Sequence, residues 1–182
     1  VGIMESSHIR VVRVADNMRN VAVTEGDKVE AQIKFGWEID AYPVNEIAEY
    51  VQETAKGDVD TLVEEYYDKY EILLEGRDPE EFKKHVAVQA QIELGFERFL
   101  KEKNYQAIVT HFGDLGALKQ LPGLAIQRLM EKGYGFGGEG DWKTAAMVRL
   151  MKIMTEGMKD AKGTSLMEDY TYNLVPGKEG IL

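Results

Sequence analysis

The stretch DPEEFKKHVAVQAQIELGFERFLKEKNYQAIVT, residues 78–110, decides the predicted fold class. It opens with residues typical of a helix start: Asp78 can cap the helix, Pro79 suits the first helical position, and Glu81 completes a capping box. Apolar residues then recur at four-residue spacing and predict one buried face: Val88, Ile92, Phe96 and Leu100. Beyond Asn104, the run AIVT at residues 107–110 predicts a short buried strand.

The same alternation of strand and helix extends on both sides of this stretch. Upstream, we predict strands over residues 8–14, 21–24 and 37–42, and helices beginning at Asp27, at Asn45 and at about residue 59. Downstream, we predict an amphipathic helix over residues 123–132 and a long helix from Asp141 to about Met158. This alternation is typical of an α/β domain with an open, mostly parallel sheet flanked by helices.

The composition excludes several classes of protein. A chain of 182 residues with 44% apolar and 30% charged residues fits a globular protein of one domain, or one and a part. Its formal net charge of −10 repels nucleic-acid phosphates and anionic lipid, and it has no run of 18 apolar residues. We therefore expect neither a nucleic-acid partner nor a membrane partner. The absence of cysteine excludes thiolate metal sites and fits a cytoplasmic location.

Both ends of the sequence indicate a fragment. The chain begins with Val1 and ends with Gly180-Ile181-Leu182, which look like neither a natural start nor a natural stop. After Gly163, the helical pattern changes to the β-like run SLMEDYTY at residues 165–172. We predict an α/β domain over residues 1–160 and the truncated beginning of a further domain over residues 161–182.

The run GYGFGG at residues 133–138 matches the dinucleotide-binding pattern G-x-G-x-x-G. That pattern binds phosphate only where a strand precedes it, because the phosphate then sits at the following helix N-terminus. A predicted helix precedes it here, and no strand ending in an acidic residue follows at the required distance. We therefore favour a helix end at Gly133 and a tight connection over nucleotide binding.

Two glutamates are candidates for chemistry. Glu139 stands between glycines just before the predicted helix start at Asp141, and Glu168 stands in the β-like run. A solvated surface position is the simpler interpretation of each residue taken alone. Together, two carboxylates would suit Mn²⁺ or Mg²⁺ better than Zn²⁺, or could act as acid and base, although the sequence does not show that they lie close together.

Four blocks of sequence resemble the L-arabinose isomerase family. They are DNMRNVAVTEGDKV at residues 16–29, KQLPGLA at 119–125, GYGFGGEGDWKTAA at 133–146 and GTSLMEDYTY at 163–172. They occur in the family's order along nearly the whole chain. The resemblance implies the central α/β domain of an arabinose/fucose isomerase over residues 1–160, followed by the first strands of a β-rich C-terminal domain over 161–182.

The resemblance also assigns roles to residues. It implies that Glu139 and Glu168 are both metal ligands and the acid/base pair, and that Met18 and Phe112 lie beside the sugar. On their own, these last two residues would be assigned to the core. The implied metal is Mn²⁺, with Co²⁺ or Mg²⁺ as alternatives. The family's two histidine ligands match none of His8, His85 and His111.

The resemblance implies a fragment of a cytoplasmic, homo-oligomeric enzyme of arabinose catabolism that converts L-arabinose to L-ribulose through an enediol. The same enzymes can also accept D-galactose. The fragment by itself is expected to be inactive because part of the ligand set is missing. A non-catalytic sugar-binding or regulatory α/β domain is the alternative, since such domains share the alternating pattern.

Overall fold

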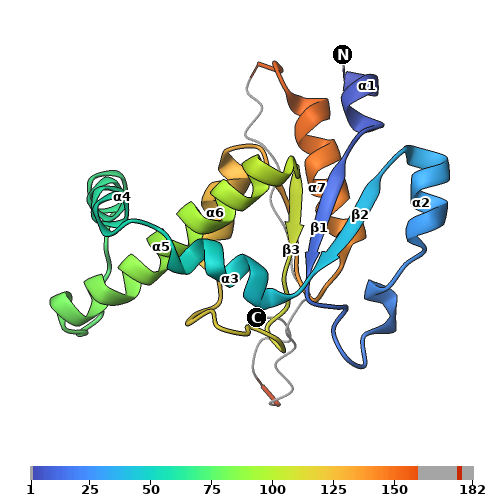
Figure 1. The fold of residues 1–182 in the computed structure, drawn as a ribbon. Helices are drawn as coiled ribbons and strands as arrows, with labels where there is room; N and C mark the ends of the chain where they lie inside the picture. The colour runs from blue at the N-terminus through green and yellow to red at the C-terminus, as the bar shows by residue number, and fades with distance from the viewer. Residues whose placement is uncertain (1, 160–175, 178–182) are drawn as a thin grey trace.

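The computed structural model describes residues 2–159 and 176–177 and is built around one parallel sheet (Figure 1). The sheet has four strands in the order β2-β1-β3-β4, and every neighbouring pair is parallel. The strands are β1 (Arg10–Val14), β2 (Glu38–Tyr42), β3 (Ala107–Val109) and β4 (Gly135–Gly137). The predicted α/β fold with a parallel sheet is therefore confirmed.

Helices cover both faces of the sheet. One face is covered by α3 (Val44–Gln52), α5 (Pro79–Lys103) and α6 (Gly123–Glu131). The other is covered by α2 (Lys28–Phe35) and α7 (Trp142–Thr155), with the short α1 (Gly2–Ser6) beside α7. Helix α4 (Lys56–Lys69) packs on the N-terminal part of α5, and this pair projects away from the sheet in Figure 1.

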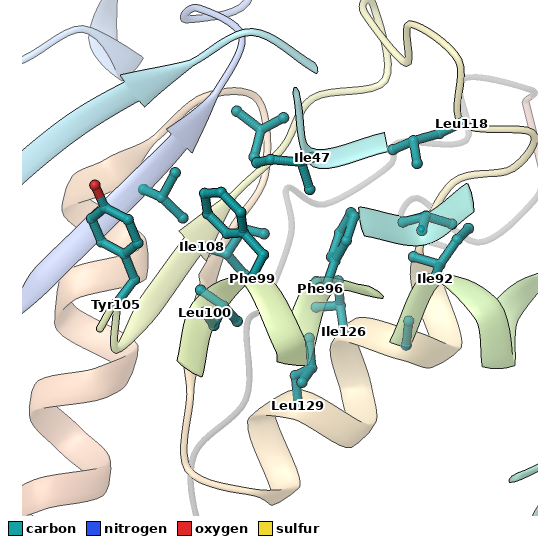
Figure 2. Packing of buried hydrophobic residues seen from close by; sticks show 14 of the residues in the cluster. Ile47, Ile92, Phe96, Phe99, Leu100, Tyr105, Ile108, Leu118, Ile126 and Leu129 are labelled. Carbon is teal, nitrogen blue, oxygen red and sulfur yellow. The ribbon is translucent and has the colours of Figure 1, made fainter. Parts of the chain in front are cut away.

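Alternating strand side chains divide the core between the two helical layers. Val12 and Ile108 point toward α3, α5 and α6, whereas Val11 and Val109 point toward α2 and α7. Figure 2 shows the first layer, where aromatic and aliphatic side chains of α5 lie against Ile108. The strands are thus buried on both faces, as parallel strands usually are.

The long helix α5 follows its predicted pattern closely. The Asp78 carboxylate accepts a hydrogen bond from the Glu81 N–H at 2.9 Å, and Pro79 occupies the first turn. The helix ends at Asn104, whose φ of 57° is left-handed. Ile92, Phe96 and Leu100 are all buried against the sheet.

Two local predictions were wrong. Residues 21–24 were predicted as a strand, but Ala22–Thr24 form a 3₁₀ helix in which backbone N–H groups bond to carbonyls three residues back. Helix α3 is not capped by Asn45: it begins at Val44, with Pro43 before it. The Asn45 side chain instead accepts a hydrogen bond from the Ala117 N–H at 3.0 Å, so a contact distant in sequence replaces the local cap.

The glycine-rich segment contains a strand that the sequence did not predict. It was expected to be only a helix end and a connection, but Gly135–Gly137 form β4 at the edge of the sheet. A Cβ on Gly135 would lie 2.2 Å from the Ala145 carbonyl oxygen, and one on Gly137 would lie 2.3 Å from that of Asp141. These glycines let the backbone of β4 touch α7 directly.

This arrangement does not support nucleotide binding at the glycine cluster. Helix α6 ends at Glu131, just before Gly133, and the third to fifth residues of the cluster form β4. Of the cluster's glycines, only Gly138 lies in the turn from β4 to α7, whereas the dinucleotide pattern places its first glycine in such a turn.

Some predictions fall beyond the described part of the chain. The β-like run at residues 165–172 and the predicted domain start at 161–182 lie outside it, except for residues 176 and 177. Within residues 2–159 and 176–177, none of the helices has the length and apolar character needed to cross a membrane.

A substitution tests the direct contact of β4 with α7. Gly135→Ala should lower the free energy of unfolding by about 1–3 kcal/mol, because its Cβ would overlap a backbone oxygen that cannot move aside cheaply. Gly57→Ala, in the first turn of α4 with open space around it, is the matched control and should be neutral or stabilising. Urea unfolding measures the free energy of unfolding of both variants. An equal change in the two would contradict the contact between β4 and α7.

Candidate functional site

The loops that follow β1, β3 and β4 meet at the carboxyl ends of these strands. The Met18 N–H donates to the Glu139 carbonyl at 2.9 Å, which joins the loop after β1 to the loop after β4. The Gly140 N–H donates to the Thr110 carbonyl at 3.2 Å, which adds the end of β3. Ligands of open α/β sheets bind at this edge, so it is the first place to search for a site.

Glu139 is held in an unusual backbone conformation. Its φ of 55° is left-handed, which costs a residue with a side chain about 1–3 kcal/mol. Two residues further on, the Asp141 carboxylate caps α7 by accepting hydrogen bonds from the Lys143 and Thr144 N–H groups at 3.0 and 3.2 Å. The cap and the contact with Met18 fix the backbone on both sides of Glu139. Strained positions of this kind concentrate at functional sites.

Gly140 brings the loop after β1 into contact with the Glu139 segment. A Cβ on Gly140 would lie 2.5 Å from the Cα of Asn17 and 2.6 Å from the carbonyl oxygen of Asp16. The φ of Gly140 is also left-handed, at 80°. Two backbones can approach this closely only because this residue has no side chain.

A buried arginine holds the loop after β1 in place. The Arg13 side chain is only 6% exposed and makes ion pairs with Asp16 at 2.7 Å and with Glu25 at 3.3 Å. The Trp142 indole N–H, at the start of α7, donates to the Glu25 carbonyl. The segment that carries Met18 is therefore tied to both β1 and α7.

A cavity of about 430 Å³ opens beside Glu139. Its walls come from the segment after β3, from α6 along most of its length, and from β4 with the turn that follows it, and most of them are apolar. The lining residues are Thr110, His111, Phe112, Leu121, Pro122, Gly123, Ile126, Gln127, Met130, Phe136, Gly138 and Glu139. A cleft with a largely apolar wall and a few polar groups is typical of a small-molecule site.

The structure brings together three of the four predicted site residues. Glu139 and Phe112 line the same cavity, and Phe112 is 55% exposed rather than packed in the core. Met18 is not among the lining residues, but its N–H binds the Glu139 carbonyl. The fourth, Glu168, lies outside the described residues.

His111 lies at the cavity although it matches neither histidine ligand of the family. It lines the cavity with Glu139, and its Nδ1 accepts a hydrogen bond from the Gly113 N–H at 3.2 Å. In the neutral ring, Nε2 then carries the proton and is a donor. Its position directly after β3 was the available signal, because the carboxyl ends of parallel strands meet at one edge of the sheet.

The described residues do not by themselves form a metal site. Among residues 2–159 and 176–177, no three His, Asp or Glu side chains are grouped so that they could hold an ion. Of the described lining residues, Glu139 is the one carboxylate, and its oxygens suit a hard cation such as Mn²⁺ or Mg²⁺. It can also exchange a proton with a molecule in the cavity.

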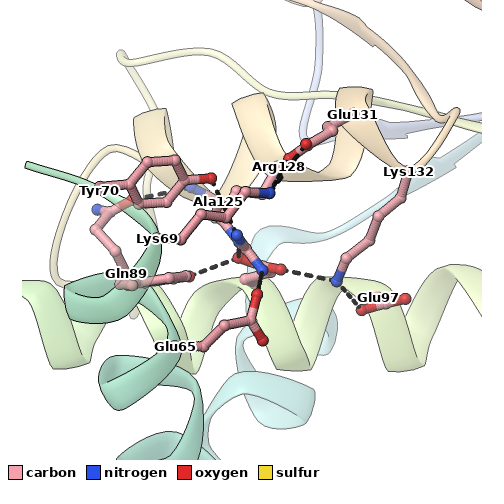
Figure 3. Close-up of polar contacts among 11 residues, drawn as sticks. Glu65, Lys69, Tyr70, Gln89, Glu97, Ala125, Arg128, Glu131 and Lys132 are labelled. Carbon is pink, nitrogen blue, oxygen red and sulfur yellow. Dashed lines mark hydrogen bonds and ion pairs between the residues drawn. The ribbon is translucent and has the colours of Figure 1, made fainter.

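The α6 wall of the cavity is anchored from behind by a buried ionic network (Figure 3). Glu93 of α5 is fully buried and accepts hydrogen bonds from Arg128 Nε at 2.7 Å and Lys132 Nζ at 2.7 Å. The Tyr66 hydroxyl of α4 donates to the same carboxylate at 2.5 Å. Burial and this hydrogen bond raise the pKa of the Tyr66 phenol, so it remains a donor. Arg128 also pairs with Glu65 at 2.6 Å, which ties α6 to α4.

Removal of one charge from the buried ion pair should destabilise the fold. Arg128→Met leaves the buried Glu93 carboxylate short of a cation and should lower the free energy of unfolding by about 3–5 kcal/mol. The double variant Glu93→Met/Arg128→Met removes both charges and should recover much of that loss. Urea unfolding of the wild type, both single variants and the double variant closes the cycle. Losses that simply add would show that the two charges are not coupled.

Comparisons with known proteins find one family. A sequence model of the L-arabinose isomerase central domain matches residues 10–157. The protein named L-arabinose isomerase from Geobacillus stearothermophilus is 53% identical over 182 residues, which is 100% of this chain and 36% of that protein. L-arabinose isomerase 1 of Clostridium acetobutylicum is 52% identical over 181 residues, 100% of this chain and 36% of the relative. The Serratia proteamaculans protein named L-arabinose isomerase is 51% identical over 171 residues, 94% of this chain and 34% of the relative. The chain thus spans about a third of the length of these relatives.

Proposed function

The chain belongs to the L-arabinose isomerase family, whose central domain it matches over residues 10–157, and from this we propose that it forms part of an enzyme that converts L-arabinose to L-ribulose. The observation that carries the proposal is the placement of Glu139. Its backbone is fixed by a cap on one side and a hydrogen bond on the other, and it lines a cavity at the carboxyl ends of the strands.

The reaction is a double proton transfer. A proton leaves C2 of the aldose and another reaches O1 to give an enediol; a proton then adds to C1 as O2 loses its own, which gives the ketose. Glu139 is one proton carrier in this proposal, and Glu168 is the other by the resemblance to the family. The order in which they act stays open. Both carbon positions must lie within hydrogen-bond reach of a carboxylate, which explains why the Glu139 backbone is fixed.

A divalent cation, Mn²⁺ with Co²⁺ or Mg²⁺ as alternatives, would polarise the sugar oxygens as a Lewis acid when bound. Glu139 and Glu168 are the residues of this chain that would hold it. The chemistry of the donors fits, because carboxylate oxygens prefer such cations.

The other cavity residues bind and shield the sugar. Phe112 offers an exposed aromatic face to the C–H groups of a pentose, and the aliphatic part of α6 keeps bulk water from the reacting carbons. Met18 lies next to Glu139 through its backbone. The sugar is neutral and needs no basic pocket, so the net charge of −10 does not oppose its binding.

The proposal also includes the substrates, the location and the partners of the enzyme. L-arabinose is the proposed substrate, and D-galactose is a second sugar that the same cavity would accept. We propose a cytoplasmic homo-oligomer without nucleic-acid or membrane partners, as expected from the acidic composition and the family resemblance.

A chimera tests the role of Glu139. The matching segment of the Geobacillus stearothermophilus relative is replaced by this chain, and the rate of ketose formation from L-arabinose is measured. Glu139→Gln should reduce kcat by at least about a hundredfold, because the amide keeps the shape but can neither carry the proton nor bind a cation well. Glu64→Gln, an exposed carboxylate on α4, is the matched control and should retain full activity.

Near-normal turnover of the Glu139→Gln chimera would overturn the assignment. Glu139→Asp separates charge from position, since it keeps the carboxylate but withdraws it by one carbon. We expect intermediate activity from this variant. The 182-residue chain by itself serves as the blank, with negligible turnover expected.

Removal of metal discriminates isomerase from a non-catalytic sugar-binding domain. Treatment of the chimera with a chelator should abolish turnover, and added Mn²⁺ should restore it. Calorimetry should show weaker Mn²⁺ binding by the Glu139→Gln chimera than by the parent. Binding of L-arabinose that is indifferent to chelation, without turnover, would instead favour the sugar-binding alternative.

A further inference from the structure

A second cavity lies at the opposite end of the sheet from Glu139. It has a volume of about 300 Å³, and its lining includes Gln106 and Tyr134, the residues that directly precede β3 and β4. It therefore opens at the amino ends of the strands. Its size is at the lower end of the range of about 300–1,000 Å³ that is typical of small-molecule sites.

Positive charge gathers around this cavity. Its lining includes the cationic groups of Lys101, Lys132 and Arg149, against the single carboxylate of Glu97 among the described lining residues. In a chain with a net charge of −10, such a local excess of cations is unusual. A site of this kind attracts a small anion and not the neutral sugar proposed above.

The two lysines are held in place by carboxylates on α5. Lys101 pairs with Glu97 at 2.7 Å, and Lys132 pairs with Glu97 at 2.6 Å and with the buried Glu93 at 2.7 Å. These hydrogen bonds outweigh the effect of burial and raise the pKa of Lys132, so its ammonium stays charged. Each lysine therefore has a carboxylate partner, so the excess positive charge of the lining must come mainly from Arg149.

Arg149 faces the cavity from α7 without a carboxylate partner among the described residues. Its Nη1 donates to the Gly133 carbonyl at 2.8 Å, and its Nε is buried with no hydrogen-bond partner in the described part of the chain. Lys152, one turn further along α7, has a lowered pKa because of burial and because of the charge of Arg149. A bound anion would relieve this repulsion between like charges.

We propose that this cavity binds a small oxyanion of the phosphate type, either free phosphate or the phosphate group of a sugar phosphate. The guanidinium of Arg149 can present two N–H groups to one phosphate, while the two ammonium groups add charge from the α5 and α6 side. The site is separate from the one that contains Glu139, so it does not depend on the isomerase activity.

Titration with inorganic phosphate tests the site. Binding to the purified protein is measured by ³¹P NMR and by the shift in melting temperature, with sodium chloride at matched ionic strength as the blank. We expect saturable binding at millimolar phosphate and a rise in melting temperature that chloride does not give. Arg149→Gln and, independently, Lys101→Gln should each weaken binding by about tenfold or more. Lys56→Gln, an exposed cation at the start of α4, is the matched control and should bind as the parent does.

A second arm with ribose 5-phosphate identifies the source of the phosphate. Tighter binding of the sugar phosphate than of inorganic phosphate, lost in both variants, supports a phosphate-ester site, while equal binding supports a free-phosphate site. Absence of saturable binding of either ligand would overturn the proposal. Binding that Arg149→Gln and Lys101→Gln leave unchanged would overturn it as well, because the anion would then lie elsewhere.

Discussion

The direct backbone contact between β4 and α7 is the constraint on which the rest of the site depends. With Gly135 and Gly137 in the strand, nothing separates β4 from the carbonyl groups of α7. The turn from one element to the other is therefore very short, and it contains Gly138, Glu139 and Gly140. Such a short turn leaves Glu139 in a left-handed conformation, and the Asp141 cap keeps it there. The position of Glu139 thus depends on Gly135 and Gly137, which have no side chains.

The α6 wall of the cavity is held by apolar packing and by buried ion pairs. Helix α6 packs on α5 through Ile126 and Leu129 and is tied to Glu93 by Arg128 and Lys132 (Figures 2 and 3). A buried ion pair adds little net stability compared with apolar packing, but it permits few arrangements of its partners. In this fold the pair restricts the rotation of α6 about its own axis, with Ile126 and Met130 at the cavity and Arg128 toward α4 and α5.

The sequence predicted elements well where local chemistry determined them. Asp78, Asp141 and the apolar spacing of α5 are local signals, and the structure confirmed each one. Prediction failed where distant partners decided the outcome. A three-residue strand with two glycines has no strand propensity of its own, and β4 exists because β3 pairs with it and α7 covers it. Of the candidate site, the family resemblance found Glu139 and Phe112, whereas the wall formed by α6 and the second cavity required the tertiary structure.

The wall formed by α6 should deform more easily than the wall formed by β4 and α7. Side chains between α6 and the sheet can change rotamer as temperature rises, so that layer can expand and contract. Between β4 and α7 the closest contacts are made by backbone atoms, which have no rotamers to exchange. On warming, the cavity should therefore widen mainly on the side of α6, while the Glu139 side keeps its dimensions. Relatives adapted to different temperatures could then differ in the packing of α6 and retain one geometry around the carboxylate.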